Sequence, residues 1–222
     1  MSTIRRAFSS SVGTKLLMGL TGLALFAYLI LHLIGNALIF AGPETFNEYS
    51  HRLVSNPLVI PVEIGLLAIF LLHIYKAFTN YVANRRARPV GYTIKKFAGY
   101  TSRKSVASST MIWSGIVIAV FVLVHVKQFK YGAWYQTVSD NPVRDLARTE
   151  FEVFSHPVWV AFYFVATLLV GLHLRHGIAS SFQSLGIDHP LYTRRLTIWG
   201  IVFAVIIGGG LACIPVWVYL TH

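Results

Sequence analysis

Five long apolar stretches constrain this chain more than any other feature of its sequence. Each is long enough to cross a hydrocarbon core as a helix, which takes about 20 residues. Only two of the polar segments between them, 83–106 and 128–155, are long. The chain is therefore predicted to be an all-α integral membrane protein with a single membrane domain over residues 1–222. We place its spans at 15–40, 57–82, 107–127, 156–182 and 197–220.

The composition supports a membrane protein and excludes several other classes. Hydrophobic residues make up 55% of the chain and charged residues only 12%, whereas soluble domains carry about 25% charged residues. A disordered chain, a coiled coil and a typical soluble enzyme are excluded. The net charge of +11 does not indicate nucleic-acid binding, because the basic residues lie between apolar runs. One cysteine, Cys213, excludes an internal disulfide and a CxxC site.

The distribution of basic residues predicts the orientation of the spans. Cytoplasmic loops of membrane proteins carry an excess of Lys and Arg. The N-terminal segment and the loops on its side of the membrane hold most of the basic residues between spans, namely Arg5, Arg6, Lys15, Arg85, Arg86, Arg88, Lys95, Lys96, Arg103, Lys104, Arg194 and Arg195. We therefore expect a multi-pass protein of the cell membrane with a cytoplasmic N-terminus, and a first run that is a retained helix, not a signal peptide.

Two outer loops contain residues at helical spacing. This spacing predicts short amphipathic helices in the outer interface. For the first segment, an ordinary polar loop is an equally good interpretation. The residues concerned are Phe46, Tyr49 and Leu53 in the first loop, and Val143, Leu146, Glu150, Phe151 and Phe154 in the second.

Histidines inside the spans are the strongest indication of function. His32, His73 and His125 lie in the first three spans, and His173 and His176 lie in the fourth. Ionisable side chains within a bilayer are costly and usually functional. For a single histidine of this kind, a packing role is as good an explanation as a functional one. Packing is a poor explanation for four spans that each hold at least one histidine.

Depth sorts these histidines into two pairs. The first and third spans run outward, and His32 and His125 both lie late in them, near the outer side. The second and fourth spans run inward, and His73 and His173 both lie late in them, near the cytoplasmic side. We therefore predict an outer pair, His32 with His125, and an inner pair, His73 with His173.

Two histidine pairs at two depths indicate two haem irons. A zinc site usually has four protein ligands, and neither pair has a cysteine or carboxylate beside it. A haem iron needs only two axial ligands beyond its porphyrin. Two imidazoles would complete the coordination and leave no open position, which suits electron transfer. The chain has no C-x-x-C-H, so these would be non-covalent b-type haems.

Four further polar groups belong to this prediction. His176 lies one helical turn after His173, so either histidine could ligate the inner iron and the other could meet a haem propionate. Lys76 and Arg175 either contact propionates or extend to the cytoplasmic interface. Glu63, in the outer part of the second span, either handles protons at a quinone site or is a carboxylate favoured by the helix start.

The chain resembles the di-haem, five-helix cytochrome b membrane anchors of succinate:quinone oxidoreductases and fumarate reductases. The resemblance extends from about residue 9 to residue 220. It rests on the order and spacing of several segments, which read SSSVGTKLLMGLTGLALFAYLILHLIGN, FNEYSHRL, NPLVIPVEIGLLAIFLLHI, SRKSVASSTMIWSG, FVLVHV and FYFVATLLVGLHLRHGIASSFQSLG.

The resemblance implies a haem ligand from each of the first four spans, which are His32, His73, His125 and, in preference to His176, His173. It also implies menaquinone as the quinone and two cytoplasmic partners, a flavoprotein with FAD and an iron–sulfur subunit. The enzyme's dicarboxylate site would lie on a partner, so this chain would carry no catalytic residue for succinate. Some quinol-oxidising relatives have a Glu two residues before the fourth ligand, where this chain has Gly171.

Three alternative functions share part of this pattern. The first is a cytochrome b subunit of another quinone-linked complex, such as a hydrogenase or formate dehydrogenase, which differs in its soluble partner. The second is a haem-free proton-linked transporter, for which the sequence offers no repeated halves. The third is a haem-free structural anchor whose histidines only pack.

Overall fold

The computed structural model describes residues 10–87 and 106–222. Within these ranges five helical segments are long and apolar enough to cross a membrane. The chain is thus an all-α, multi-pass membrane protein, as predicted. The spans are Ser11–Ala41, Val59–Arg86, Met111–Phe129, Pro157–Ser184 and Pro190–Thr221. The basic residues Arg5, Arg6, Arg88, Lys95, Lys96, Arg103 and Lys104, used above for the orientation, lie outside the described residues.

The first two spans are joined by a short outer helix. The first consists of α2 (Ser11–Ala37) and the 3-10 helix η1 (Leu38–Ala41). The Ser10 hydroxyl caps α2 by accepting a hydrogen bond from the Gly13 N–H at 3.0 Å, which satisfies one of the free amides of the first turn. Helix α3 (Pro43–Val54) follows, and α4 (Val59–Arg86) is the second span.

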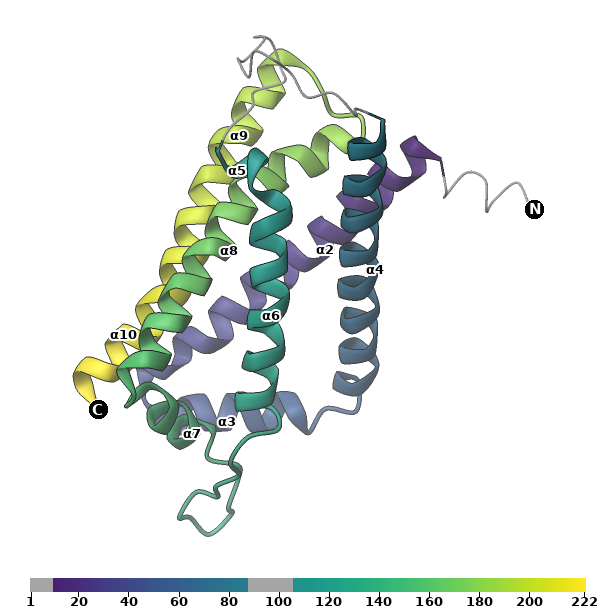
Figure 1. The fold of residues 1–222 in the computed structure, drawn as a ribbon. Coiled ribbons are helices and arrows are strands. Elements are labelled where there is room, and N and C mark those ends of the chain that lie inside the picture. The colour runs from purple at the N-terminus through teal and green to yellow at the C-terminus, as the bar shows by residue number, and fades with distance from the viewer. Residues whose placement is uncertain (1–9, 88–105) are drawn as a thin grey trace.

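The remaining spans are α6 (Met111–Phe129), α8 (Pro157–Ser184) and a composite last span. The short α5 (Val106–Ser109) precedes α6, and α7 (Leu146–Phe154) lies between α6 and α8. The last span joins α9 (Pro190–Ala204), the π-helical turn η2 (Val205–Gly209) and α10 (Gly210–Thr221). Helices α3 and α7 lie at the same end of the bundle (Figure 1).

Helix α8 is the centre of the bundle. It packs against α2, α6, α9 and α10, and buried residues run along its whole length, from Val160 to Ser181. Helix α4 is the opposite case, because it stands at one edge (Figure 1) and none of its residues is buried. Helix α4 therefore packs on α2 through side chains that stay only partly buried.

The span limits lie within a few residues of the predicted ones, and the largest difference is at the start of the last span. The last helical segment begins at Pro190 instead of residue 197, because Pro190 takes the first helical position, which suits its fixed backbone, and the His189 ring caps the Leu191 N–H. Both outer loops contain the expected short helix, but Val143 lies outside α7. Asp145 begins that helix by accepting a hydrogen bond from the Arg148 N–H.

Candidate functional site

The structure brings His32 and His125 together. His32 lies on α2 and His125 on α6, and their ring centroids are 5.6 Å apart with planes at 84°. Two imidazoles on opposite sides of one metal ion have centroids about 6 Å apart, given metal–nitrogen distances of about 2.0 Å. The Nδ1 atom of His125 is buried and has no hydrogen-bond partner in the described part of the chain. This pair therefore has the spacing of two axial ligands and an unmet polar atom.

Aromatic side chains surround the outer pair. Phe121, Phe129 and Tyr163 all lie within 6.0 Å of His125, measured between ring centroids. Tyr163 is buried, and its hydroxyl donates a hydrogen bond to Gln128 Oε1 at 2.6 Å. On the other side, Tyr28 stacks on His32 with ring centroids 5.4 Å apart. The side chains around the outer pair are therefore mostly apolar, which suits a porphyrin ring, and the two polar groups among them are the hydroxyls of Tyr28 and Tyr163.

The inner histidines are each held by a hydroxyl from another helix. His73 Nδ1 lies 3.0 Å from Thr21 Oγ1 of α2, and His173 Nδ1 lies 3.0 Å from Ser114 Oγ of α6. His173 is also close enough to His73 for direct electrostatic interaction. The structure therefore places these two histidines near each other, at a different depth from the outer pair.

Both hydroxyls also lie within hydrogen-bond distance of a backbone carbonyl of their own helix, Thr21 of the Leu17 carbonyl at 2.7 Å and Ser114 of the Met111 carbonyl at 3.1 Å. A hydroxyl has one hydrogen to donate. In the arrangement where that hydrogen goes to the carbonyl, the hydroxyl accepts from Nδ1–H and the Nε2 atom keeps its lone pair, which is the state of a neutral imidazole that binds a metal. Sequence reasoning missed both hydroxyls, because Thr and Ser in a span are usually packing residues.

Two glycines let the inner rings approach the neighbouring backbone. A Cβ atom at Gly22 would lie 3.4 Å from His73 Cε1, and one at Gly115 would lie 3.6 Å from His173 Cε1. Gly22 follows Thr21, and Gly115 follows Ser114. Each inner histidine is therefore seated against a pair consisting of a hydroxyl residue and a glycine.

The other predicted cytoplasmic-side residues are less close to the inner pair. His176 is half-buried and interacts electrostatically with His173. Arg175 is exposed, and its backbone carbonyl faces Gly200 of α9. Two residues correspond to about 200° around a helix, so Arg175 points away from His173. The Lys76 ammonium lies 5.9 Å from the centroid of the Tyr75 ring.

Glu63 is tied to the outer pair through Tyr28. Its carboxylate forms an ion pair with Lys130, which follows α6, and it interacts electrostatically with Tyr28. The Tyr28 hydroxyl lies 3.4 Å from His32 Nδ1. Glu63 also lies beyond the first turn of α4, where the helix dipole acts only weakly. Its position therefore fits a role at the outer site better than a helix-start role.

These residues fit two bis-histidine haems. Among the described residues no group of three or more His, Cys, Asp or Glu side chains could hold a metal ion. Haem iron needs only two protein ligands, so paired imidazoles suffice. Helix α4, which carries His73 and Glu63, has no buried residue and leaves one face for a large apolar group.

One known protein is similar to most of the chain. The succinate dehydrogenase cytochrome b558 subunit of Bacillus subtilis (strain 168) is 28% identical over 172 residues, which are 77% of each chain. At the family level, the chain is thus similar to a succinate dehydrogenase cytochrome b subunit. The family resemblance predicted from the sequence is thus confirmed. No protein-family model and no solved structure matches the chain.

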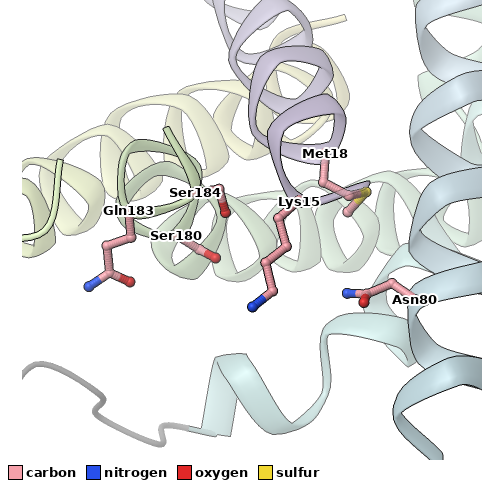
Figure 2. Close-up of a pocket in the computed structure, with 6 residues that line it drawn as sticks. All are labelled: Lys15, Met18, Asn80, Ser180, Gln183 and Ser184. Carbon is pink, nitrogen blue, oxygen red and sulfur yellow. The ribbon is translucent and has the colours of Figure 1, made fainter. Parts of the chain in front are cut away.

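A polar pocket lies at the end of the bundle that the sequence predicts to be cytoplasmic. It has a volume of about 340 Å³ and is lined by residues of α2, α4 and α8, namely Lys15, Met18, Asn80, Ser180, Gln183 and Ser184. Figure 2 shows the Lys15 ammonium extending among the polar side chains of these helices. Lys15 was counted above only as an orientation signal. The pocket could not be expected from the sequence, because three helices build it.

Proposed function

We propose that this chain holds two b-type haems and carries electrons from an iron–sulfur subunit to a quinone in a succinate dehydrogenase. One observation carries the proposal. The rings of His32 and His125 from two helices lie 5.6 Å apart between centroids, and His73 and His173 from two other helices each have Nδ1 at 3.0 Å from a hydroxyl, which supports two histidine pairs as metal ligands.

The haem ligands would be His32 and His125 at the outer site and His73 and His173 at the inner site. When bound, the two haems supply one-electron carriers between a cytoplasmic iron–sulfur partner and a quinone, menaquinone by the family resemblance. His173 is a better fourth ligand than His176, because Ser114 holds its ring. A flavoprotein with FAD would oxidise succinate outside this chain.

The chain's own residues would seat the cofactors and handle protons. The pocket around Lys15 offers a cation and several hydrogen-bond donors, which suits the anionic propionates of the inner haem. Lys76 and His176 remain further candidates for this contact. At the outer site, Glu63 lies near Tyr28, whose hydroxyl is 3.4 Å from His32 Nδ1, and it would deliver protons to or accept them from a quinone there.

The test is the haem content of the intact, detergent-purified complex. We expect two b-type haems per chain with the low-spin electron paramagnetic resonance signals of bis-imidazole iron. His32→Ala or His125→Ala should remove one haem, and His73→Ala or His173→Ala the other. His176→Ala should retain both, as should His156→Ala, a control at an exposed histidine.

The same preparation separates the alternatives. Covalently bound flavin or free FAD with iron–sulfur clusters in co-purifying subunits supports the proposal, whereas nickel or molybdenum would assign the chain to a hydrogenase or formate dehydrogenase. A colourless wild-type complex in which no haem can be reconstituted would favour a transporter or a bare anchor.

A further inference from the structure

Glu150 is a buried carboxyl group with no cation paired to it in the part of the chain that the structure describes. It lies on α7 with only 5% of its surface exposed, and its Oε2 atom has no hydrogen-bond partner within the described ranges. Among the described residues it also forms no ion pair. A buried charge without a partner is very costly, so such a group binds a proton instead. Burial raises the pKa of Glu150 to about 8.

The burial of Glu150 is built into the fold. Asp145 accepts hydrogen bonds from the Arg148 N–H at 3.0 Å and from Asn47 Nδ2 at 2.8 Å. Asn47, a buried residue of α3, in turn accepts from the Ala147 N–H at 2.9 Å. These bonds join α3 to the first turn of α7. They fix the rotation of α7, and with it the inward direction of Glu150.

Tyr163 links Glu150 to the outer histidine pair. Glu150 is close enough to the Tyr163 side chain for direct electrostatic interaction, and the Tyr163 ring centroid lies 6.0 Å from that of His125. Apart from half-buried His176 on α8, the remaining charged or titratable groups on the elements that pack on α7 are exposed or already engaged. They are Glu44, Glu48, Tyr49, His51 and Arg52 on α3, Asp145 before α7, Arg148 and Glu152 on α7, Lys127 on α6, His156 before α8, His173 and Arg175 on α8, Cys213 and Tyr219 on α10, and His222 after it.

Arg144 is a half-buried cation that precedes α7. Its Nη2 donates to the Phe129 carbonyl at 2.7 Å, its guanidinium lies 4.6 Å from the centroid of the Trp134 ring, and its Nε is buried without a hydrogen-bond partner among the described residues. Within the same described ranges, Arg144 forms no ion pair with Glu150.

We propose that Glu150 is the redox-linked proton-binding group of the outer histidine site. In the pH range where Glu150 is ionised while the site is oxidised, its carboxylate gains one proton from the outer aqueous phase when the site gains one electron from the iron–sulfur partner. It releases that proton when the electron leaves to the quinone. The negative charge of the added electron is thus balanced by the positive charge of the proton that Glu150 binds. The proposal rests on the proposed function, since it requires a bis-histidine haem at His32 and His125.

Redox titration of the intact complex at several pH values tests this proposal. Glu150→Gln keeps the shape of the neutral carboxyl group but cannot titrate, and Glu152→Gln is the control at an exposed carboxylate of the same helix. In the wild type and the control, the midpoint potential of the outer haem should fall as the pH rises through about 8. The midpoint potential can fall by at most about 59 mV per pH unit. This is the potential change that corresponds to a tenfold change in proton concentration when one proton is taken up with one electron. In Glu150→Gln this slope should flatten, with the inner haem unchanged.

Infrared difference spectra provide a second readout that does not depend on activity. Reduced-minus-oxidised spectra of the wild type should contain a protonated carboxyl band that shifts in D₂O and is absent from Glu150→Gln. If Glu150→Gln does not assemble, Glu150→Asp should keep the potential slope and displace this band. An outer haem whose slope and carboxyl band are the same in wild type and Glu150→Gln would overturn the inference. Absence of the outer haem from the wild type would instead overturn the proposed function.

Discussion

Gly171 of α8 and Gly208 of the last span meet backbone to backbone. A Cβ atom at Gly208 would lie 2.8 Å from Gly171 Cα, and one at Gly171 would lie 2.8 Å from the Ala204 carbonyl oxygen. Small residues permit such close helix contacts in membranes, where packing replaces the hydrophobic effect as the driving force. Gly171 is the position at which some quinol-oxidising relatives carry a Glu. This chain has no room at Gly171 for any side chain, so the packing excludes a carboxylate at this position.

Gly171→Ala should destabilise the bundle, because the new methyl group must push α8 away from η2. Overpacking of this kind costs about 1–3 kcal/mol. Gly177→Ala, on the same helix, is the matched control, since a Cβ atom there meets nothing within 4 Å. Thermal unfolding in detergent, followed by circular dichroism, should give a lower midpoint for Gly171→Ala only. Equal midpoints for the two variants would mean that the contact is loose.

Thr21→Val and Ser114→Ala should each weaken the inner haem site, since each removes the group that orients one imidazole. Loss of such an outer-shell partner typically costs 10–100-fold in metal affinity. Haem retention during dilution should therefore fall for the inner haem, while the outer haem is unaffected. Thr197→Val is the control, because Thr197 bonds back to the Thr193 carbonyl in the same way and holds no histidine. Unchanged retention in both test variants would remove the Nδ1 hydrogen bonds from the mechanism.

The spans and the depth of each histidine could be predicted because both depend on local hydropathy and on helix length. The contacts that hold the imidazole rings of the inner histidines could not be predicted from the sequence. Thr21 and His73 are 52 residues apart, and Ser114 and His173 are 59 apart, so only helix packing brings them together. The spacing of α7 already placed Glu150 with apolar residues, yet its burial depends on Asn47, about 100 residues away. No pattern in the sequence indicates that bond.

Glu63→Gln should slow quinone reduction while leaving the fold intact. The ion pair with Lys130 is nearly half-exposed on both sides, so its loss costs at most about 1 kcal/mol. A positioned proton donor or acceptor typically contributes 10²–10⁴-fold to a rate. We therefore expect kcat for quinone reduction to fall by about 100-fold with full haem content. Glu48→Gln, which breaks the exposed pair with Arg52, is the control. An unchanged rate in Glu63→Gln would leave Glu63 as an interfacial helix residue.

The stability of the chain should decrease with rising pH because of Glu150. Its pKa is raised to about 8 in the folded protein, against about 4.3 for Glu in an unfolded chain. Between these values the folded state binds one proton more, so the neutral carboxyl group stabilises the fold at low pH, and this contribution is lost as the pH rises toward 8.

For one titrating group, the free energy of unfolding can change by at most about 1.4 kcal/mol per pH unit. Glu150→Gln, which stays neutral, should show a flatter dependence of the thermal midpoint between pH 5.5 and 8.5, whereas Glu152→Gln should follow the wild type. Parallel curves for wild type and Glu150→Gln would mean that Glu150 is ionised in the folded protein. A group already ionised at pH 5.5 could not take up a proton near pH 8, so this result would also count against its redox-linked role.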